Sequence, residues 1–201
     1  MIRMKYNTII FDFGKVLVDY DFGPAIRKYI PTVELQREFA SVFCSDEFIN
    51  ACDLGIKTVP ELMQELVEEH PVFIPYISNL KLTVGDFIPG EISGMRELLT
   101  ELKEKGIRLL GLTNWSASVY DIIAAYPEMF SLLDGRMISS EEHLIKPDVR
   151  IFQRLIEKFS LNPAECLFVD DKAVNIEGAI KAGLNGHQFI SAENLRRFLA
   201  L

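Results

Sequence analysis

The sequence contains no long uninterrupted apolar run, and this excludes the common membrane-spanning classes. A transmembrane helix needs roughly 18 or more consecutive apolar residues, and no such stretch occurs. The apolar run nearest the start, Ile9–Phe11, is followed at once by Asp12 and is much shorter than the apolar part of a secretory signal. We therefore expect a cytoplasmic protein with no membrane partner.

Positive charge and cysteine are both scarce. Lys and Arg number 21 against 29 Asp and Glu, the formal net charge is −8, and no useful Lys/Arg run is present. Nucleic-acid binders usually present a basic face, so we expect no nucleic-acid partner. The cysteines, Cys44, Cys52 and Cys166, are an odd number without metal-type spacing, and we expect free buried thiols. The three histidines share no motif, and we expect structural or surface roles for them.

What the sequence does contain is an alternation of short apolar runs and helical patterns. The runs are bounded by polar residues or glycine, as is typical of buried parallel strands. They lie at Thr8–Phe13, Arg108–Thr113 and Cys166–Val169, with a fourth candidate at Gly186–Ile190. Strands that alternate with helices predict an α/β fold, a Rossmann-like core with a parallel sheet flanked by helices.

Three helical patterns lie after these runs or between them. Apolar residues from Met95 to Leu102 follow the helical period, and Gly106 is placed to end that helix. The same period runs from Val149 to Phe159, with Asp148 positioned to cap the start. A shorter version includes Ile176, Ala179, Ile180 and Gly183.

The stretch from residue 20 to residue 83 has a different character, with helical patterns but no clear strand. Thr58 and Glu61 form a capping-box pattern ahead of an apolar helical run. We therefore predict a core domain of residues 1–19 and 84–201, with an inserted helical cap domain of residues 20–83. An insertion directly after the first strand lies over the carboxyl end of the sheet, where open α/β sheets bind ligands.

Four short segments with chemically active side chains fall at the ends of predicted strands or close to them. Asp12 lies at the end of the first, and Thr113 and Asn114 close the second. Lys146 precedes a proline, and the pair at 170 and 171, Asp170-Asp171, follows the third strand. Adjacent carboxylates repel one another, and a bound cation readily explains such a pair.

These residues can be combined into a phosphoryl-transfer site. An anionic carboxylate attacks a phosphate dianion only if positive charge relieves their repulsion, and Mg²⁺ and Lys146 can supply it. Thr113 and the amide of Asn114 can donate hydrogen bonds to phosphate oxygens. Asp12 would then form a phosphoaspartate that water hydrolyses. Mg²⁺ would need few protein oxygens, and Asp12 and Asp171 are candidates.

The four segments together resemble the haloacid dehalogenase-like hydrolase superfamily. The matching stretches begin at Ile10, Leu112, Lys146 and Phe168 and occur in the expected order. The first motif looks most similar to that of bacterial sugar-phosphate phosphatases with Asp-x-Gly-Asn-Val, although Lys15 replaces the Asn. The resemblance implies a Rossmann-like core with a helical cap and a small phosphorylated metabolite as substrate, with sugar phosphates among the candidates.

The resemblance also implies a role for each matching residue. Asp12 is the nucleophile, Thr113 and Asn114 bind phosphate, and Lys146 stabilises the transferring charge. The Mg²⁺ ligands would be Asp12, the main-chain carbonyl of Gly14, and Asp171, with Asp170 as direct or water-mediated support. The oligomeric state could be a monomer or a homodimer.

The sequence departs from the superfamily pattern at Gly14. Most phosphatases of this superfamily have an Asp there, which protonates the leaving group and later activates water. Three explanations stay open: a leaving group that needs little protonation, such as the anomeric oxygen of a sugar 1-phosphate; an acid from elsewhere; or a weakly active or non-catalytic phosphate-ligand binder. The candidate acids are Asp19, Asp21 and Glu47.

A 2-haloacid dehalogenase is a further alternative, in which Asp12 displaces halide and forms an ester. That chemistry needs no metal, and relatives that perform it have a serine-rich last motif. The carboxylates of Asp170 and Asp171 therefore argue against it. The sequence also leaves open whether Trp115 lines the substrate pocket or only packs.

Overall fold

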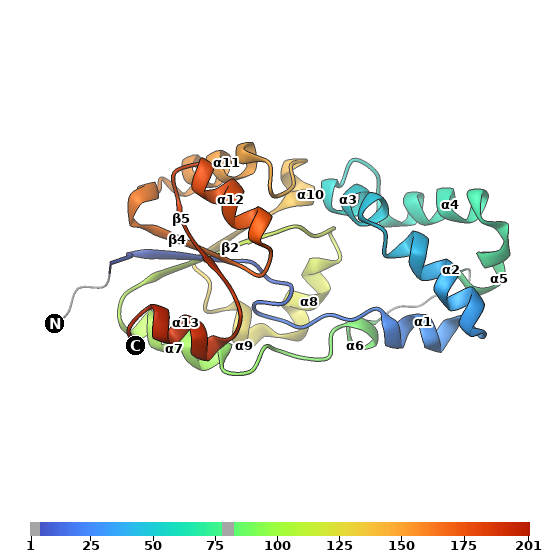
Figure 1. Cartoon of the computed structure of the whole chain (residues 1–201), viewed down its shortest axis with the longest axis horizontal. Helices are drawn as coiled ribbons and strands as arrows, with labels where there is room; N and C mark the ends of the chain where they lie inside the picture. Colours follow the sequence, from blue (N-terminus) through green and yellow to red (C-terminus); the bar gives the residue numbers. More distant parts are fainter. Residues whose placement is uncertain (1–4, 78–82) are drawn as a thin grey trace.

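A five-stranded parallel sheet forms the centre of the larger part of the molecule (Figure 1). The computed structural model describes residues 5–77 and 83–201. The strands lie in the order β3-β2-β1-β4-β5. Their bounds are Thr8–Phe11 (β1), Arg108–Thr113 (β2), Gly135–Ile138 (β3), Cys166–Asp170 (β4) and Asn185–Gln188 (β5). The α/β prediction is confirmed, and β1 lies at the middle of the sheet between β2 and β4.

Helices cover both faces of this sheet (Figure 1). One face is covered by α11 (Val149–Phe159) and α12 (Ala173–Lys181). The opposite face carries α7 (Met95–Glu104), α8 (Val119–Ala125), α9 (Pro127–Phe130) and α13 (Ala192–Phe198). The short helix α10 (Ser139–Glu142) directly follows β3. Asp148 caps α11 as predicted, since its side chain accepts a hydrogen bond from the Arg150 amide at 2.9 Å.

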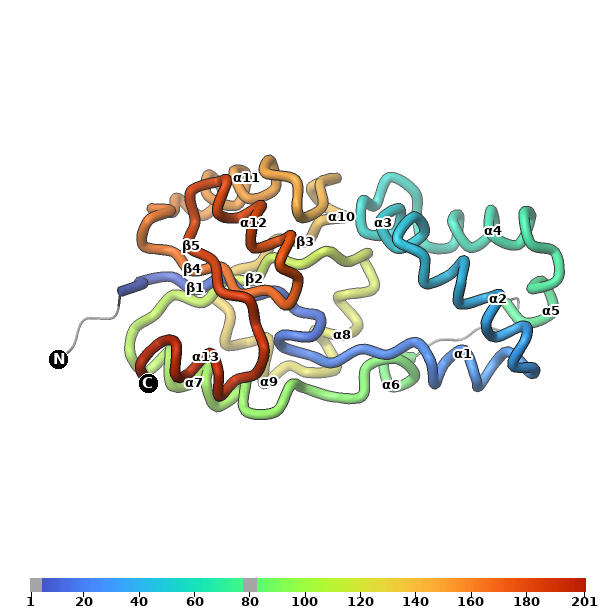
Figure 2. The backbone as a smooth tube through the Cα atoms, viewed as in Figure 1, coloured from blue at the N-terminus to red at the C-terminus, as the bar shows by residue number. Residues whose placement is uncertain are grey.

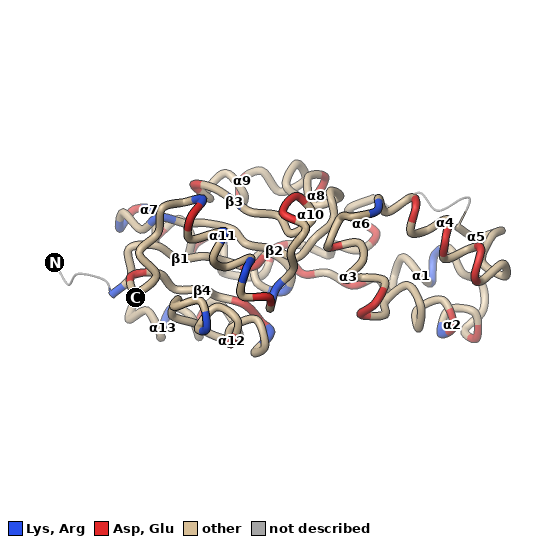
Figure 3. The backbone as a smooth tube through the Cα atoms, turned by 90° about the horizontal axis from the view of Figure 1, so that it is seen from above, with Lys and Arg blue, Asp and Glu red and all other residues tan. Residues whose placement is uncertain are grey.

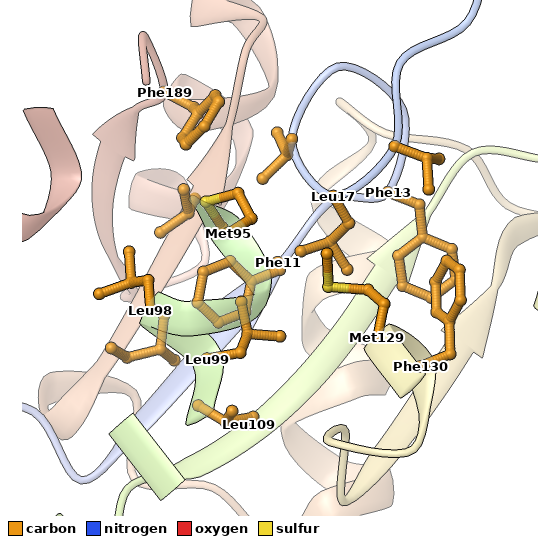
Figure 4. Packing of buried hydrophobic residues seen from close by; sticks show 14 of the residues in the cluster. Phe11, Phe13, Leu17, Met95, Leu98, Leu99, Leu109, Met129, Phe130 and Phe189 are labelled. Carbon is orange, nitrogen blue, oxygen red and sulfur yellow. The ribbon is translucent and has the colours of Figure 1, made fainter. Parts of the chain in front are cut away.

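Alternate residues of each strand face the two helical layers, because side chains point to opposite faces of a sheet with a period of two. Phe11 packs in the layer of α7 and α13, whereas Ile10 packs against α11 and α12. In Figure 4, Phe13 lies against Phe130, with ring centroids 4.9 Å apart. Each fully buried side chain of this size contributes about 1.5–3 kcal/mol, so both layers hold β1 firmly beneath the site.

The sequence prediction was wrong in some details of the core. It missed β3, a four-residue edge strand that contains Gly135 and the exposed Arg136. It placed the last strand at Gly186–Ile190, whereas β5 ends at Gln188. Ile180, predicted on the apolar face of α12, is 55% exposed.

Five α-helices and a short 3₁₀ helix between residues 23 and 77 lie beyond the carboxyl ends of the strands (Figures 1 and 2). Their bounds are Gly23–Tyr29 (α1), Val33–Phe43 (α2), Asp46–Leu54 (α3), Val59–Glu69 (α4), Pro71–Phe73 (η1) and Ile74–Ile77 (α5), and α6 (Val84–Phe87) leads back to the core. We call α1 to α5 with η1 the cap helices.

The cap helices bury an apolar cluster of their own, which is separate from the two core layers. Ile30 and Phe73 are fully buried within it. The predicted capping box is present, because Thr58 and Glu61 exchange hydrogen bonds at the start of α4. The predicted domain boundaries at 20 and 83 stay a proposal, and the parts of that prediction at 1–4 and 78–82 lie outside the described residues.

Charged positions are interspersed over the described chain, with Lys and Arg scattered among Asp and Glu (Figure 3). Within the described ranges, no helix has the length and apolarity that a membrane span requires. All three cysteines are free, as expected, but only Cys166 is buried, and Cys44 and Cys52 are partly exposed.

Candidate active site

Asp12 lies directly after β1, at the middle of the carboxyl edge of the sheet. Its amide donates to the carbonyl of Val169 at 2.9 Å and so continues the pairing of β1 with β4. Its Oδ1 atom accepts the Phe13 amide at 2.7 Å and lies 2.9 Å from Lys146 Nζ. The side chain is 12% exposed, so the carboxylate is not completely closed off from solvent.

Lys146 brings a positive charge into this buried position. Its Nζ donates to Asp170 Oδ2 at 2.7 Å and to the Leu112 carbonyl at 3.1 Å, in addition to the contact with Asp12. Only 1% of the side chain is exposed. An ammonium has three donors, and all three therefore have acceptors. Lys146 links two carboxylates that are far apart in the sequence.

Asn114 fixes the backbone of Lys146. The Lys146 amide donates to Asn114 Oδ1 at 2.8 Å, and Asn114 Nδ2 donates to the Lys146 carbonyl at 3.0 Å. The Asn114 side chain is thus engaged in positioning the lysine. Only its main-chain amide is left for the phosphate-binding role that the sequence suggested.

The two adjacent carboxylates differ sharply in their surroundings. Asp170 is fully buried, and its oxygens accept from the Lys172 amide at 2.8 Å, from Asn175 Nδ2 at 3.0 Å and from Lys146. Burial opposes ionisation, but Lys146 and these hydrogen bonds hold the pKa of Asp170 below its usual range. No hydrogen bond or ion pair of the described residues involves the carboxylate of Asp171. Burial and the neighbouring Asp170 charge raise the pKa of Asp171.

The three carboxylates converge on one point. One oxygen each of Asp12, Asp170 and Asp171 can be chosen so that all three lie within 4.8 Å of one another. Three carboxylates and the single Lys146 ammonium leave a net charge of −2 when ionised. No hydrogen bond among the described residues uses the Gly14 carbonyl oxygen, which follows Asp12 by two residues. This donor set fits a hard divalent cation such as Mg²⁺, which prefers a small number of protein oxygens.

Thr113, at the end of β2, supplies independent evidence for a ligand. Thr113 is fully buried, and within the described chain its Oγ1 atom has no hydrogen-bond partner. A buried hydroxyl without a partner costs roughly 1–3 kcal/mol. A phosphate oxygen at this edge of the sheet would accept the hydroxyl proton, so the sequence prediction of a phosphate-binding Thr113 fits its surroundings.

Burial disfavours the ionised form of Asp12, which a bound cation would favour. Burial raises the pKa of Asp12 from 3.8 to about 7, an effect that Lys146 opposes and that Asp170 reinforces. A nucleophile must be ionised, and a bound divalent cation favours the ionised form of a carboxylate. A cation bound beside Asp12 would therefore oppose the effect of burial and lower the pKa of this carboxyl.

The position that the sequence singled out as lacking an acid is crowded by aromatic rings. A β-carbon at Gly14 would lie 3.0 and 3.1 Å from carbons of the Tyr20 ring and 3.2 Å from the Trp115 ring. The two rings meet edge to face, with centroids 5.9 Å apart. Tyr20 and Trp115 therefore fill the space next to Gly14 that a larger side chain would need, and Trp115 packs at the border of the site.

Lys15, which replaces the expected Asn, points to neighbours other than the carboxylate cluster. Its ammonium bonds to the Asp19 carboxylate and lies 5.0 Å from the centre of the Tyr20 ring. Asp19 also accepts the Tyr20 amide at 2.9 Å. The segment after Asp12 is therefore held as a compact turn, and Asp19 is already engaged.

Sequence reasoning missed two residues near this site, Ser139 and Asp53. Ser139, after β3, accepts the Trp115 amide at 2.9 Å and donates to the Asp53 carbonyl at 2.7 Å. Asp53 comes from α3, far from the four motifs. No pattern in the sequence distinguishes it from an ordinary helix residue, because its position depends on how the cap helices sit on the core.

Comparison with known proteins supports a family assignment. The model of the haloacid dehalogenase-like hydrolase family matches residues 6–183. Acyl-CoA dehydrogenase family member 10 of Mus musculus is 26% identical over 193 residues, which cover 90% of this chain and 18% of the mouse protein. A phosphatase of Mycobacterium tuberculosis is 25% identical over 195 residues, or 92% of this chain and 87% of the relative. The chain spans 18% to 47% of the length of three of its curated relatives, the mouse protein among them.

A solved structure shares the fold. It is a HAD family enzyme of Bacteroides thetaiotaomicron in complex with magnesium and inorganic phosphate. The TM-score is 0.71 at 19% identity, over 96% of this chain and 98% of that one. At this level of identity, the likeness establishes the common architecture.

Proposed function

The chain belongs to the haloacid dehalogenase-like hydrolases, and from that premise we propose that it is a Mg²⁺-dependent phosphatase acting through an aspartyl-phosphate on Asp12. Its substrate would be a small phosphorylated metabolite, with sugar phosphates among the candidates. The observation that carries the proposal is the convergence of three carboxylates within 4.8 Å, next to a lysine that bonds to two of them. A curated phosphatase that aligns over most of both chains supports it, as does the bound magnesium and phosphate of the Bacteroides enzyme.

Some residues of the site would bind the cation directly, and one would give it additional support. Asp12, Asp171 and the Gly14 carbonyl would hold Mg²⁺, because none of these oxygens except Asp12 Oδ1 is engaged among the described residues. Asp170 would support the cation directly or through a water molecule, since its oxygens already accept hydrogen bonds from Lys146, Lys172 and Asn175. Bound Mg²⁺ would withdraw charge from the phosphate and lower its repulsion of the nucleophile.

The remaining groups would handle the phosphoryl group. The Thr113 hydroxyl and the Asn114 amide would donate to its oxygens. Lys146 would hold the Asp12 carboxylate in one orientation through its 2.9 Å contact and would balance the charge that moves during transfer. Asp12 would attack phosphorus, the ester bond would break, and water would then hydrolyse the phosphoaspartate.

The dehalogenase alternative has less support. Displacement of halide by Asp12 needs no cation, whereas the cluster of Asp12, Asp170 and Asp171 carries more negative charge than Lys146 can balance. A phosphatase site that binds Mg²⁺ accounts for this excess of negative charge. Its phosphate would also supply the missing hydrogen-bond acceptor for the Thr113 hydroxyl, which has no partner among the described residues.

A phosphate-release screen tests the function. Sugar 1-phosphates, sugar 6-phosphates and p-nitrophenyl phosphate would be incubated with the protein, with Mg²⁺ or with a chelator. We expect release from at least one ester that depends on Mg²⁺ and is lost in Asp12→Asn. Asp121→Asn, an exposed carboxylate on α8, is the matched control and should behave as the parent. Halide release from a 2-haloacid without metal, or activity that survives in Asp12→Asn, would contradict the proposal.

A further inference from the structure

The end of α3 is attached directly to the core beside the active site. The Asp53 carbonyl accepts from Ser139 Oγ at 2.7 Å, and the same Oγ accepts the Trp115 amide at 2.9 Å. The next carbonyl, that of Leu54, lies 2.9 Å from His143 Nδ1. These contacts connect the cap helices to the loop that follows β2 and to α10, which follows β3.

Close packing makes this attachment specific. Gly55 ends α3 in the left-handed conformation, with φ of 64°, and a β-carbon there would lie 2.5 Å from the Ser140 carbonyl oxygen. Only glycine allows the helix to end so near to the core. The backbone of Asp53 is therefore held at a defined place, as a positioned catalytic group requires.

The carboxyl group of Asp53 has no fixed partner. It is half-buried, and no hydrogen bond or ion pair among residues 5–77 and 83–201 involves it. Loss of hydration is the main influence on its ionisation, and the positive charges of Lys146 and Lys172 act on it in the opposite direction. Lys146 is the lysine that contacts Asp12, so Asp53 lies within electrostatic range of the reaction centre.

Tyr20 responds to the charges of both Asp53 and the carboxylate cluster. Burial is the largest cause of the raised pKa of its phenol, and the charges of Asp171, Asp12 and Asp53 raise it further. Asp53 and the cluster therefore both lie within electrostatic range of one side chain. The half-buried ring of Tyr20 also covers Gly14.

On the basis of the proposed phosphatase activity, we propose that Asp53 is the general acid–base residue of this site, supplied by the cap helices in place of the side chain missing at Gly14. The nearby rings of Tyr20 and Trp115 occupy the position where such a group would otherwise reside. Asp53 belongs to α3, one of the cap helices, and its main-chain carbonyl is bonded to Ser139, which in turn accepts the Trp115 amide. Among the acids that the sequence suggested, Asp19 is bonded to Lys15 and Asp21 accepts the Gly23 amide.

With Asp53 in this role, each of the two chemical steps has a donor and an acceptor for its proton. In the first, an Asp12 oxygen attacks phosphorus, the bond from phosphorus to the leaving oxygen breaks, and that oxygen takes the proton of the Asp53 carboxyl to give an alcohol. In the second, water attacks phosphorus, gives a proton to the Asp53 carboxylate, and the bond from phosphorus to Asp12 breaks. Inorganic phosphate and the starting enzyme result.

The ionisation of Asp53 suits such a role. Burial raises its pKa to about 7, so both forms are populated near neutral pH, as acid–base catalysis requires. The groups whose charges act on it are Lys146 and Lys172, and it acts on Tyr20 and Cys52 in turn. On the core side, His143 contacts the adjacent Leu54.

The test compares two leaving groups in the first step alone. Rapid-quench kinetics would follow release of the alcohol from a sugar 6-phosphate and of p-nitrophenol from p-nitrophenyl phosphate. For Asp53→Asn we expect about a 10²–10⁴-fold slower release of the sugar and less than about a tenfold change for p-nitrophenol, which departs without a proton. With the nitrophenyl ester, the phosphoenzyme should accumulate, because water activation is also lost.

The controls separate structural damage from a chemical role. Asp46→Asn, at the exposed start of the same helix, should match the parent on both esters. An equal slowing of both first steps in Asp53→Asn would assign Asp53 to cap placement, and an unchanged sugar release would also overturn its acid–base role. If the parent protein forms no Asp12 phosphoenzyme with either ester, the proposed function itself fails, which is a different result.

Discussion

Replacement of Lys146 by Met tests whether the buried charge cluster is as tightly coupled as the distances indicate. Lys146 Nζ lies 2.9 Å from Asp12 and 2.7 Å from Asp170, and the exposed fractions of these three side chains are 1%, 12% and 0%. Removing one partner of a buried ion pair costs about 3–5 kcal/mol, because the remaining charge is left unpaired. Two carboxylates lose their partner here, so we expect the free energy of unfolding to fall by at least this amount in the presence of a chelator.

The expected loss is large enough to measure by thermal or denaturant unfolding. For a chain of this size, 1 kcal/mol corresponds to about 2–4 °C in Tm, so Lys146→Met should unfold roughly 6–20 °C lower. Adding Asp170→Asn should recover part of the loss, with an interaction energy of about 0.5–3 kcal/mol. Lys103→Met is the matched control, because Lys103 pairs with Asp134 at the surface, where both side chains are 35% exposed. It should cost less than about 1 kcal/mol.

A loss in Lys146→Met no larger than that of Lys103→Met would refute this reasoning. Strict additivity of Lys146→Met and Asp170→Asn would do so as well. Either result would mean that the cluster is hydrated and flexible, and that the short distances to Lys146 do not represent a desolvated network.

Three further outcomes follow from the same site. Thr113→Val should raise the free energy of unfolding of the ligand-free protein by about 1 kcal/mol and weaken binding of inorganic phosphate roughly 10–100-fold; unfolding and calorimetry would measure this, and unchanged phosphate affinity would contradict it. Gly14→Asp should cost about 1–3 kcal/mol without raising turnover of a sugar phosphate, because Tyr20 and Trp115 crowd the position; faster turnover at full stability would contradict it. Because burial raises the pKa of Asp12 from 3.8 to about 7, its protonated form stabilises the metal-free fold, fully below pH of about 4, and this contribution is lost as the pH rises through about 7. Mg²⁺ affinity should therefore fall by up to about tenfold per pH unit below about 7 in the parent protein, and calorimetry at several pH values that found no such fall would count against it.

The central part of the fold was predictable because strong local signals coincide there. Each of β1, β2 and β4 is a continuous apolar run bounded by polar residues, which is typical of a strand buried on both faces. β3 escaped prediction because its four residues include a glycine and an exposed arginine. An edge strand of this kind forms only because β2 offers it hydrogen bonds, a condition that no local pattern expresses.

In the candidate site, too, some residues could be predicted from the sequence and others could not. Asp12, Thr113, Lys146 and the pair at 170 and 171 could be named because strands of a parallel sheet end at a common edge. The engagement of the Asn114 side chain with Lys146 depends on the path of a loop 32 residues away. The position of Asp53 depends on the contact of α3 with α10. Contacts between distant segments therefore determine the parts of the site that spacing could not predict.

Reductive trapping of the phosphoenzyme tests the central claim most directly. The protein would be mixed with a turned-over phosphate ester and Mg²⁺, quenched in acid, treated with borohydride and digested for mass spectrometry. A phosphoaspartate is reduced to homoserine, and we predict this conversion at Asp12 alone, dependent on Mg²⁺ and absent in Asp12→Asn. Full turnover with an unmodified Asp12, or conversion of a different carboxylate, would contradict the account.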